Sequence, residues 1–320
     1  MLFLYVMELS TQQLADKINE SPIICIDGSY VIYHMLFSAV KKWVEQSLYS
    51  SVVTDADMND PNFEQVDLLI YDDFKETIRD TIFGTLNRIQ NLINEFKTER
   101  FIQQVDEVFF VLDPLKGSKL HSWRYLVYPE YKGTRATKKK EKPFHIMKIF
   151  YAIEEELLEN PLYSSKLPLR FLYADACEAD DIIATIMLED GNLDKHRLLI
   201  ASDHDYLQLE NVKQVTLEGK EVLIEQPYPE LVKITPELYL LSKIITGDVS
   251  DNITQVFNRV GYKTACKRYL ANLEVLQESL EHDKVAFSKF KRNSKLIDFK
   301  RIPETIRNIA REQFIKKPSC

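Results

Sequence analysis

Acidic residues follow the ends of several short apolar runs in this chain of 320 residues. Residues 198–201 form one such run, and Asp203 and Asp205 come shortly after it. An isolated pair like this is typical of a turn, because Asp can bond its own backbone. Other runs end in the same way, so the acids need a shared explanation. The complete set is Asp27, Asp113, Glu178, Asp180, Asp181, Asp203, Asp205, Asp248 and Asp251.

Four apolar runs alternate with helical patterns along the first two thirds of the chain. The runs cover residues 23–26, 108–112, 169–173 and 198–201, and helical patterns cover 74–96 and 144–159. This alternation predicts an α/β fold with a mostly parallel central sheet flanked by helices. The carboxyl ends of parallel strands meet at one edge of the sheet, where ligands bind. We therefore expect the acids that follow these runs to converge.

The last two acids follow a predicted helix. Thr235 is a suitable N-cap, Pro236 suits the first helical position, and Gly247 ends the helix. Asp248 and Asp251 follow, spaced so that both side chains can lie on one side of a turn.

Nine convergent carboxylates require a cation, because like charges a few ångströms apart raise each other's pKa. Oxygen ligands without His or Cys favour hard ions, so Mg²⁺ is expected and Mn²⁺ can substitute. This number of carboxylates suggests two ions about 4 Å apart, the arrangement used for in-line displacement at phosphorus. The alternative is that some acids are helix caps or solvated turn residues, as Asp181 and Asp251 could be individually.

Composition limits the class of protein. Four cysteines without a C-x-x-C pair predict neither a zinc site nor a disulfide framework, so a reducing intracellular setting is expected. No apolar run is long enough to span a membrane. The net charge of −8 argues against a nucleic-acid partner only if the acids are spread evenly over the surface. Without the nine site carboxylates, the rest of the chain has a net charge of −8 + 9 = +1.

Basic residues concentrate in a few segments. Residues 132–142 carry a local excess of five positive charges and follow several aromatic residues, a mixture suited to single-stranded nucleic acid. A second basic segment, 288–301, could extend that contact toward a duplex, or could be the polar face of an ordinary helix. Residues 55–73 are strongly acidic and do not fit a calcium loop, so we expect a solvated insertion that nucleic acid avoids.

The acidic motifs together resemble the flap endonuclease or 5′-nuclease family. The motifs are Asp27 at its strand end, FVLDP, CEADDIIA, ASDHDYLQL and GDVSDNI, in this order and spacing. Within the family, the segment LIDFKRIPETI and the short length are most similar to the RNase H, a 5′ to 3′ exonuclease, of T-even-like bacteriophages. The resemblance covers residues 21–315. It implies a PIN-like nuclease domain at 1–234 with a helical arch at about 116–148, and a smaller helical duplex-binding domain at 235–320.

The resemblance also implies roles for individual residues. Asp27, Asp113, Glu178 and Asp180 match the tightly bound metal site, Asp203, Asp205, Asp248 and Asp251 match the second site, and Asp181 is a shared neighbour. Lys132 and Arg135 match arch residues that steer the scissile phosphate, and they are the catalytic candidates. The nucleic-acid-binding candidates are Trp123, Arg124, Tyr131, Lys138, Lys139, Lys140, Gly261, Lys263 and Thr264.

One segment departs from the family pattern. QVFNRVGYKTA keeps Gly261, Lys263, Thr264 and Ala265 of the duplex-binding turn but lacks its other glycines. This loss leaves the family's monovalent-ion site in question.

The function implied by the resemblance is a Mg²⁺-dependent 5′ to 3′ nuclease that removes RNA primers and nearby DNA and cleaves 5′ flaps. Expected substrates are DNA, RNA:DNA hybrids and flapped or nicked duplexes. A single-strand binding protein and a sliding clamp are expected partners of a monomer in the cytoplasm, that of the host if a phage encodes it. The alternatives are a non-catalytic, metal-ordered DNA-binding protein and a phosphatase. An aspartyl phosphatase would need D-x-D at the first strand, where residues 27–29 read DGS.

Overall fold

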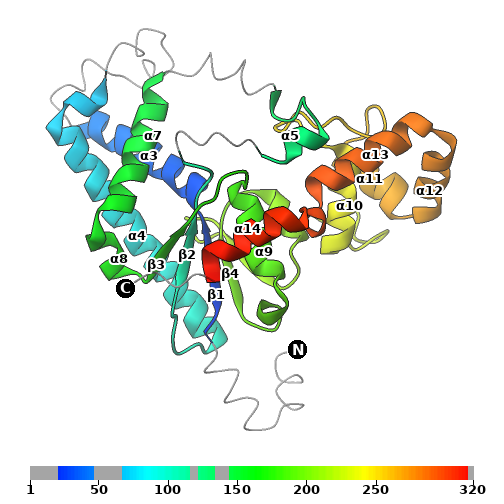
Figure 1. Ribbon diagram of the computed structural model, residues 1–320. Coiled ribbons are helices and arrows are strands. Elements are labelled where there is room, and N and C mark those ends of the chain that lie inside the picture. Colours follow the sequence, from blue (N-terminus) through cyan, green and yellow to red (C-terminus); the bar gives the residue numbers. More distant parts are fainter. Residues whose placement is uncertain (1–20, 47–66, 116–121, 134–143, 316–320) are drawn as a thin grey trace.

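Five parallel strands form the centre of the computed structural model, which describes residues 21–46, 67–115, 122–133 and 144–315. They are β1 (Ile23–Asp27), β2 (Val108–Val111), β3 (Leu169–Leu172), β4 (Arg197–Ile200) and β5 (Val212–Val215). Their order in the sheet is β3-β2-β1-β4-β5 (Figure 1). The predicted parallel sheet is confirmed, and β5 is a strand that the sequence pattern did not predict.

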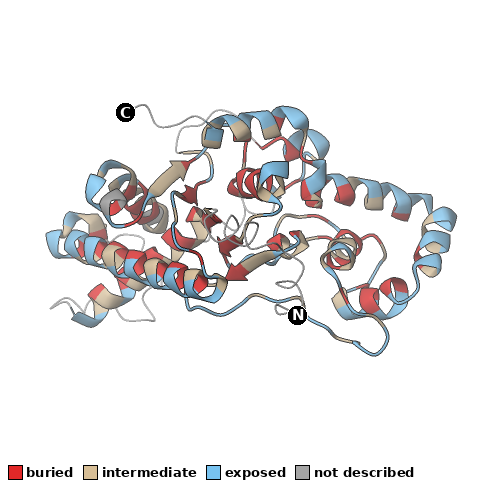
Figure 2. Ribbon diagram, turned by 90° about the horizontal axis from the view of Figure 1, so that it is seen from below, coloured by how far each residue is buried: buried red, intermediate tan, exposed pale blue. Residues whose placement is uncertain are grey.

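Alternating side chains of the strands pack on helices at both faces of the sheet. Ile24 and Ile26 of β1 join one hydrophobic core, whereas Cys25 joins the other. The first core is covered by α3 (Gly28–Gln46), α4 (Asp72–Arg100), α7 (Phe144–Glu159) and α8 (Pro161–Lys166), and the second by α9 (Ala179–Leu188) and α14 (Glu304–Ile315). Figure 2 shows the buried residues along the strands and on the inner sides of the helices. Burial on both faces explains why the strands are continuous apolar runs.

The strand order creates a switch point at the carboxyl edge of the sheet. The chain runs from central β1 outward to β2 and β3, then returns to the other side of β1 to form β4 and β5. The connections after β1 and β4 therefore leave in opposite directions, which is where open parallel sheets bind ligands. Asp27, the last residue of β1, lies at this point.

Helices predominate after β5. The described helical elements not yet named are η3 (Leu68–Ile70), α5 (Arg124–Val127), η4 (Asp190–Asn192), η5 (His204–Gln208), α10 (Pro236–Thr246), α11 (Tyr262–Ala265), the π-helical η6 (Cys266–Leu270), α12 (Leu273–His282), α13 (Lys284–Ile297) and η7 (Phe299–Arg301). As predicted, Thr235 caps α10 and Gly247 follows its last residue. Helices α10–α12 share a core of their own.

The last helix returns to the sheet. Ile306 and Ala310 of α14 pack in the same core as Ile182 and Ile186 of α9. The division into 1–234 and 235–320 stays a proposal, and its second segment ends against the first.

Some predicted features lie outside the described residues. They are Arg135, Lys138, Lys139 and Lys140, the parts of the predicted arch at 116–121 and 134–143, and most of the acidic segment 55–73. Within the described part, no helix is both long enough and apolar enough to cross a membrane.

Candidate metal and nucleic-acid site

The start of α9 holds three acids together. Glu178 is its N-cap, and its backbone N–H donates to Asp181 Oδ2 at 3.0 Å, forming a capping box. Asp180 lies between them in sequence, and ligand oxygens of the three carboxylates lie within 4.8 Å of one another. The next backbone N–H, that of Ala179, donates to Asp113 Oδ1 at 3.0 Å. Backbone N–H groups at the helix N-terminus thus hold Asp113, Glu178 and Asp181.

Arg124 is the buried cation of this acidic group. Its guanidinium lies 2.9 Å from Glu178, 3.4 Å from Asp180 and 2.9 Å from Asp181, with 3% of the side chain exposed. Its Nε donates to the carbonyl of Leu296 at 3.1 Å. Despite burial, which opposes the charge, these carboxylates raise the pKa of Arg124. Burial raises the pKa of both Asp180 and Asp181 above the usual range, and Arg124 opposes that rise.

Residues at the described base of the predicted arch bridge two groups of acids. The Tyr131 hydroxyl lies 2.9 Å from Glu178 Oε2 and 2.9 Å from Asp251 Oδ2. Lys132 forms an ion pair with Glu178, and its backbone N–H donates to the carbonyl of Asp251 at 2.9 Å. Burial opposes ionisation of Glu178, but Lys132 and Arg124 hold its pKa below the usual value.

Asp27, Asp113 and Asp203 come from the ends of three adjacent strands. Burial, with the nearby charges of Asp113 and Asp203, raises the pKa of Asp27 to about 7. The Tyr30 N–H and the Tyr206 hydroxyl donate to Asp27 at 3.1 Å and 3.3 Å and partly offset this rise.

Lys243 joins the remaining acids. Its Nζ lies 2.8 Å from Asp205 and 3.0 Å from Asp248. Burial raises the pKa of Asp205 to about 6 even with Lys243 beside it. The pKa of Asp248 is lowered, because Lys243 and hydrogen bonds from Ser250 outweigh its burial.

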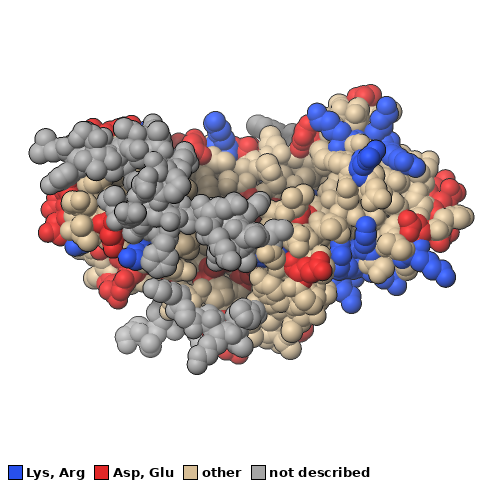
Figure 3. Space-filling view, turned by 90° about the horizontal axis from the view of Figure 1, so that it is seen from above, with Lys and Arg blue, Asp and Glu red and all other residues tan. Residues whose placement is uncertain are grey.

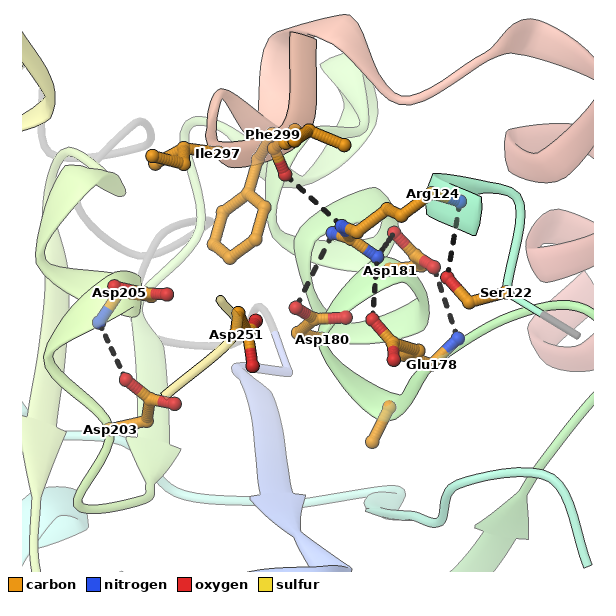
Figure 4. Close-up of polar contacts among 12 residues, drawn as sticks. Ser122, Arg124, Glu178, Asp180, Asp181, Asp203, Asp205, Asp251, Ile297 and Phe299 are labelled. Carbon is orange, nitrogen blue, oxygen red and sulfur yellow. Dashed lines mark hydrogen bonds and ion pairs between the residues drawn. The ribbon is translucent and has the colours of Figure 1, made fainter. Parts of the chain in front are cut away.

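The structure brings the predicted acids to one edge of the sheet. Figure 4 shows Asp251 between Asp203 and Asp205 on one side and Asp180 and Glu178 on the other. The donors are carboxylate oxygens, which suit a hard divalent cation. Asp180 Oδ1 is also buried without a hydrogen-bond partner among the described residues, as expected for an oxygen that needs an ion. The cluster therefore fits divalent metal.

The predicted nucleic-acid contacts differ in accessibility. Trp123 is buried and its indole N–H donates to Asp181 at 3.2 Å, so it lies under the acids, beside Arg124. Gly261, Lys263 and Thr264 lie on the surface at the start of α11, where Lys263 is 3.7 Å from Glu225. Tyr131 is buried against the acids, as described above.

Three residues at the site were not found from the sequence. Lys243 lies in the last turn of α10, directly before the turn that carries Asp248 and Asp251, yet its apolar neighbours in sequence gave no sign that it faces acids. Tyr206 directly follows the predicted D-x-D motif, and its hydroxyl donates to Asp27. Glu154 of α7 is 8% exposed, and its burial and nearby Asp113 raise its pKa to about 7. An acid on the apolar face of a helix was the available signal for Glu154.

Comparison with known proteins identifies the family. The profile described as 5'-3' exonuclease, N-terminal resolvase-like domain, matches residues 22–230. The chain belongs to this family. It is 23% identical over 249 residues to a 5'-3' exonuclease of Buchnera aphidicola subsp. Schizaphis graminum, covering 77% of this chain and 69% of that one. It is 27% identical over 208 residues to Ribonuclease H of Enterobacteria phage T4, covering 60% of this chain and 65% of the relative.

Solved structures of phage T5 proteins share the fold. The T5 D15 protein co-crystallised with metal ions matches with a TM-score of 0.57 and 17% identity, covering 92% of this chain and 98% of that one. A T5 D15 flap endonuclease in a pseudo-enzyme-product complex with DNA and metal ions matches with the same values. The predicted family is confirmed, and the protein is a hydrolase of the 5'-3' exonuclease family with an acidic cluster able to bind metal.

Proposed function

We propose that this protein is a Mg²⁺-dependent 5′ to 3′ nuclease that hydrolyses RNA:DNA hybrids and duplex DNA from the 5′ end. It also cleaves 5′ flaps and removes RNA primers during DNA replication. The single observation that supports this most strongly is the meeting of acids from β1, β2, β4, α9 and the turn after α10 around one edge of the sheet.

The protein's own residues have separate tasks in this proposal. Glu178, Asp180 and Asp113 hold one side of the metal site, and Asp203 and Asp205 hold the other. Held by these residues, two Mg²⁺ ions would supply the positive charge that favours ionised water and stabilises the attacking and leaving oxygens. None of the carboxylates has to act as a general base.

Lys132 is proposed to bind the scissile phosphate. Its ammonium is already paired with Glu178, at the centre of the acids. A cation at this position offsets charge that develops on the phosphoryl oxygens. Arg135 has the same proposed task but lies outside the described residues. Lys263 and Thr264, exposed at the start of α11, are proposed to contact the duplex.

A cleavage assay tests the proposed function. A 5′-labelled RNA:DNA hybrid is incubated with the protein in Mg²⁺ and in EDTA, and short oligonucleotide products are expected only with Mg²⁺. We expect Asp180→Asn to lower the rate by about a hundredfold or more, because a ligand oxygen and a charge are lost together. Asp175→Asn is the matched control, since Asp175 is exposed on the loop that leads into α9.

The outcomes separate the three candidate functions. A non-catalytic DNA-binding protein would bind the hybrid but release no product, and a phosphatase would release phosphate while leaving the strand intact. A wild-type protein inactive on hybrids, flaps and nicked duplexes in both Mg²⁺ and Mn²⁺ would exclude the nuclease proposal. A sliding clamp, a single-strand binding protein and a monomeric state remain proposals drawn from the family.

A further inference from the structure

A basic groove lies between α5 and α13, outside the carboxylate cluster. Its volume is about 680 Å³. The residues that matter here are Val127, Phe287, Lys291, Arg292, Lys295 and Arg301. Four of these are cations, and no acid is among the described residues that line the groove. Figure 3 shows many Lys and Arg side chains on the part of the molecule that carries the C-terminal helices.

The groove combines open apolar surface with available positive charge. Phe287 is 43% exposed and Val127 is 37% exposed. Two of the cations are already engaged, since Arg292 lies over the Tyr128 ring and contacts Thr254, and Arg301 pairs with Asp298. The other two, Lys291 and Lys295, are exposed and form no ion pair within the described part of the chain.

The two lysines suit successive charges along a strand. They are four residues apart on α13, so their side chains leave the same face with a rise of about 6 Å between them. Lys291 Nζ lies 4.3 Å from the centroid of the Phe287 ring, which places an ammonium and an apolar surface side by side.

The groove begins beside the acids. Arg124, the first residue of α5, contacts both Glu178 and the carbonyl of Leu296 on α13. Lys295 precedes Leu296 directly, and Lys291 lies one turn farther from the acids. A strand held at the carboxylates and leaving over α5 would therefore meet Lys295 first and Lys291 next.

We propose that this groove binds a single-stranded 5′ segment of the substrate, with Lys291 and Lys295 on phosphates and Phe287 and Val127 against bases or sugars. The proposal rests on the proposed nuclease function. Unpaired nucleotides are favoured over duplex because a groove with an aromatic, apolar floor can accept exposed bases. A duplex would offer mainly phosphates and would leave this floor uncovered.

A binding experiment tests the groove. Affinity is measured by fluorescence anisotropy in Ca²⁺ for a blunt duplex and for the same duplex with a 5′ oligothymidine overhang, and gels verify that the strands stay intact. In Lys291→Gln/Lys295→Gln, we expect affinity for the overhang duplex to fall about tenfold or more. The slope of log affinity against log salt should fall by about 0.7 for each lysine. Affinity for the blunt duplex should stay unchanged.

Two further variants separate charge from packing. Lys289→Gln is the matched control, since Lys289 lies on the same helix away from the groove, and it should leave both affinities unchanged. Phe287→Ala should weaken overhang binding about tenfold without changing the salt slope, because it removes apolar contact and no charge. Thermal unfolding of each variant verifies that it is folded.

The results distinguish failure of the groove from failure of the nuclease. Equal loss of affinity for both duplexes, or no loss for either, would overturn the groove proposal. If neither affinity fell, an acidic protein would be the better candidate partner for this surface. A wild-type protein whose overhang binding depends on the lysines but which cleaves nothing would retain the groove and refute the nuclease. Cleavage with unaltered overhang binding in the double variant would retain only the nuclease.

Discussion

Individual acids at this site differ in how their charge is neutralised. Arg124 contacts the group around Glu178, and Lys243 contacts Asp205 and Asp248. No Lys or Arg ion pair reaches Asp27 within the described residues, and its pKa is raised to about 7. The need for an external cation is therefore greatest at Asp27, because burial and like charges act there without a paired side chain.

This difference predicts an unusual effect of Asp27→Asn. The Asp27 carboxyl titrates near pH 4 in the unfolded chain and near pH 7 in the folded protein. The protonated carboxyl therefore contributes stability that is complete below pH 4, and this contribution is lost as the pH rises through about 7. Without metal, we expect the variant to be more stable than wild type by about 4 kcal/mol at pH 8 and equal to it near pH 4. Urea unfolding in EDTA at several pH values measures this.

A matched control and a contrary result are available. Asp175→Asn should show no such pH dependence, because Asp175 is exposed. Destabilisation of Asp27→Asn at pH 8 in EDTA would contradict the raised pKa of Asp27. In Mg²⁺ the same variant should lose nuclease activity, because a neutral amide replaces one of the negatively charged carboxylates.

At the scale of elements, the close approach of α3 to β2 positions Asp27. Gly28, the first residue of α3, is packed so tightly that an added Cβ would lie 2.6 Å from the carbonyl oxygen of Val111. The same side chain would lie 2.7 Å from Leu112 and Phe110. The backbone of β2 cannot move aside as a flexible side chain can, so only glycine allows α3 to start this close to β2. This close approach keeps Asp27, the residue before Gly28, near Asp113, which follows β2.

Gly28→Ala should therefore destabilise the protein by about 3 kcal/mol and lower nuclease activity, because α3 must move away from β2. Gly84→Ala is the control of opposite sign. Gly84 lies within α4, and no atom of the residues that the structure describes lies within 4 Å of where its Cβ would be, so alanine there should stabilise by about 0.5–1 kcal/mol. Chemical denaturation of both variants measures the difference, and a neutral Gly28→Ala would refute the packing account.

At the scale of the whole molecule, the acidic site joins distant parts of the chain. Its acids come from three strand ends, the start of α9 and the turn after α10. Tyr131 and Lys132 add the segment between β2 and β3. A divalent ion bound there would neutralise the acids and link these elements at once.

Metal binding should consequently stabilise the whole protein. With Mg²⁺ at about 100 times its dissociation constant, the gain is about 2.7 kcal/mol, or roughly 5 °C in melting temperature. Asp180→Asn should lose most of this shift, whereas Asp175→Asn should keep it. Differential scanning calorimetry with Mg²⁺ and with EDTA measures it, and an equal shift in all three proteins would show that the ion binds elsewhere.

The C-terminal helices also act at this scale. The α13 carbonyl of Leu296 is bound by Arg124, and η7 and α14 pack on α9. The surface proposed for single-stranded nucleic acid is thus fixed to the acidic site through buried contacts, and the two can act on one substrate.

The sequence by itself determined the parallel sheet and the family, and it predicted which residues could hold metal. These features can be recognised in short stretches of sequence, because continuous apolar runs indicate buried strands and acids follow them directly. Parallel strands then place those acids at one edge without further information. Strand β5, with its partly exposed and polar VKQV segment, lacked the apolar run that marks the others.

Only the tertiary structure decided which cation neutralises which acid. Arg124 contacts Glu178 across 54 positions of sequence, and its type and spacing suited nucleic acid equally well. Helical periodicity identifies the face on which Lys243 or Glu154 lies, but not the element that this face meets. Long-range pairing depends on how whole helices pack on the sheet, so it becomes visible only when the chain is folded.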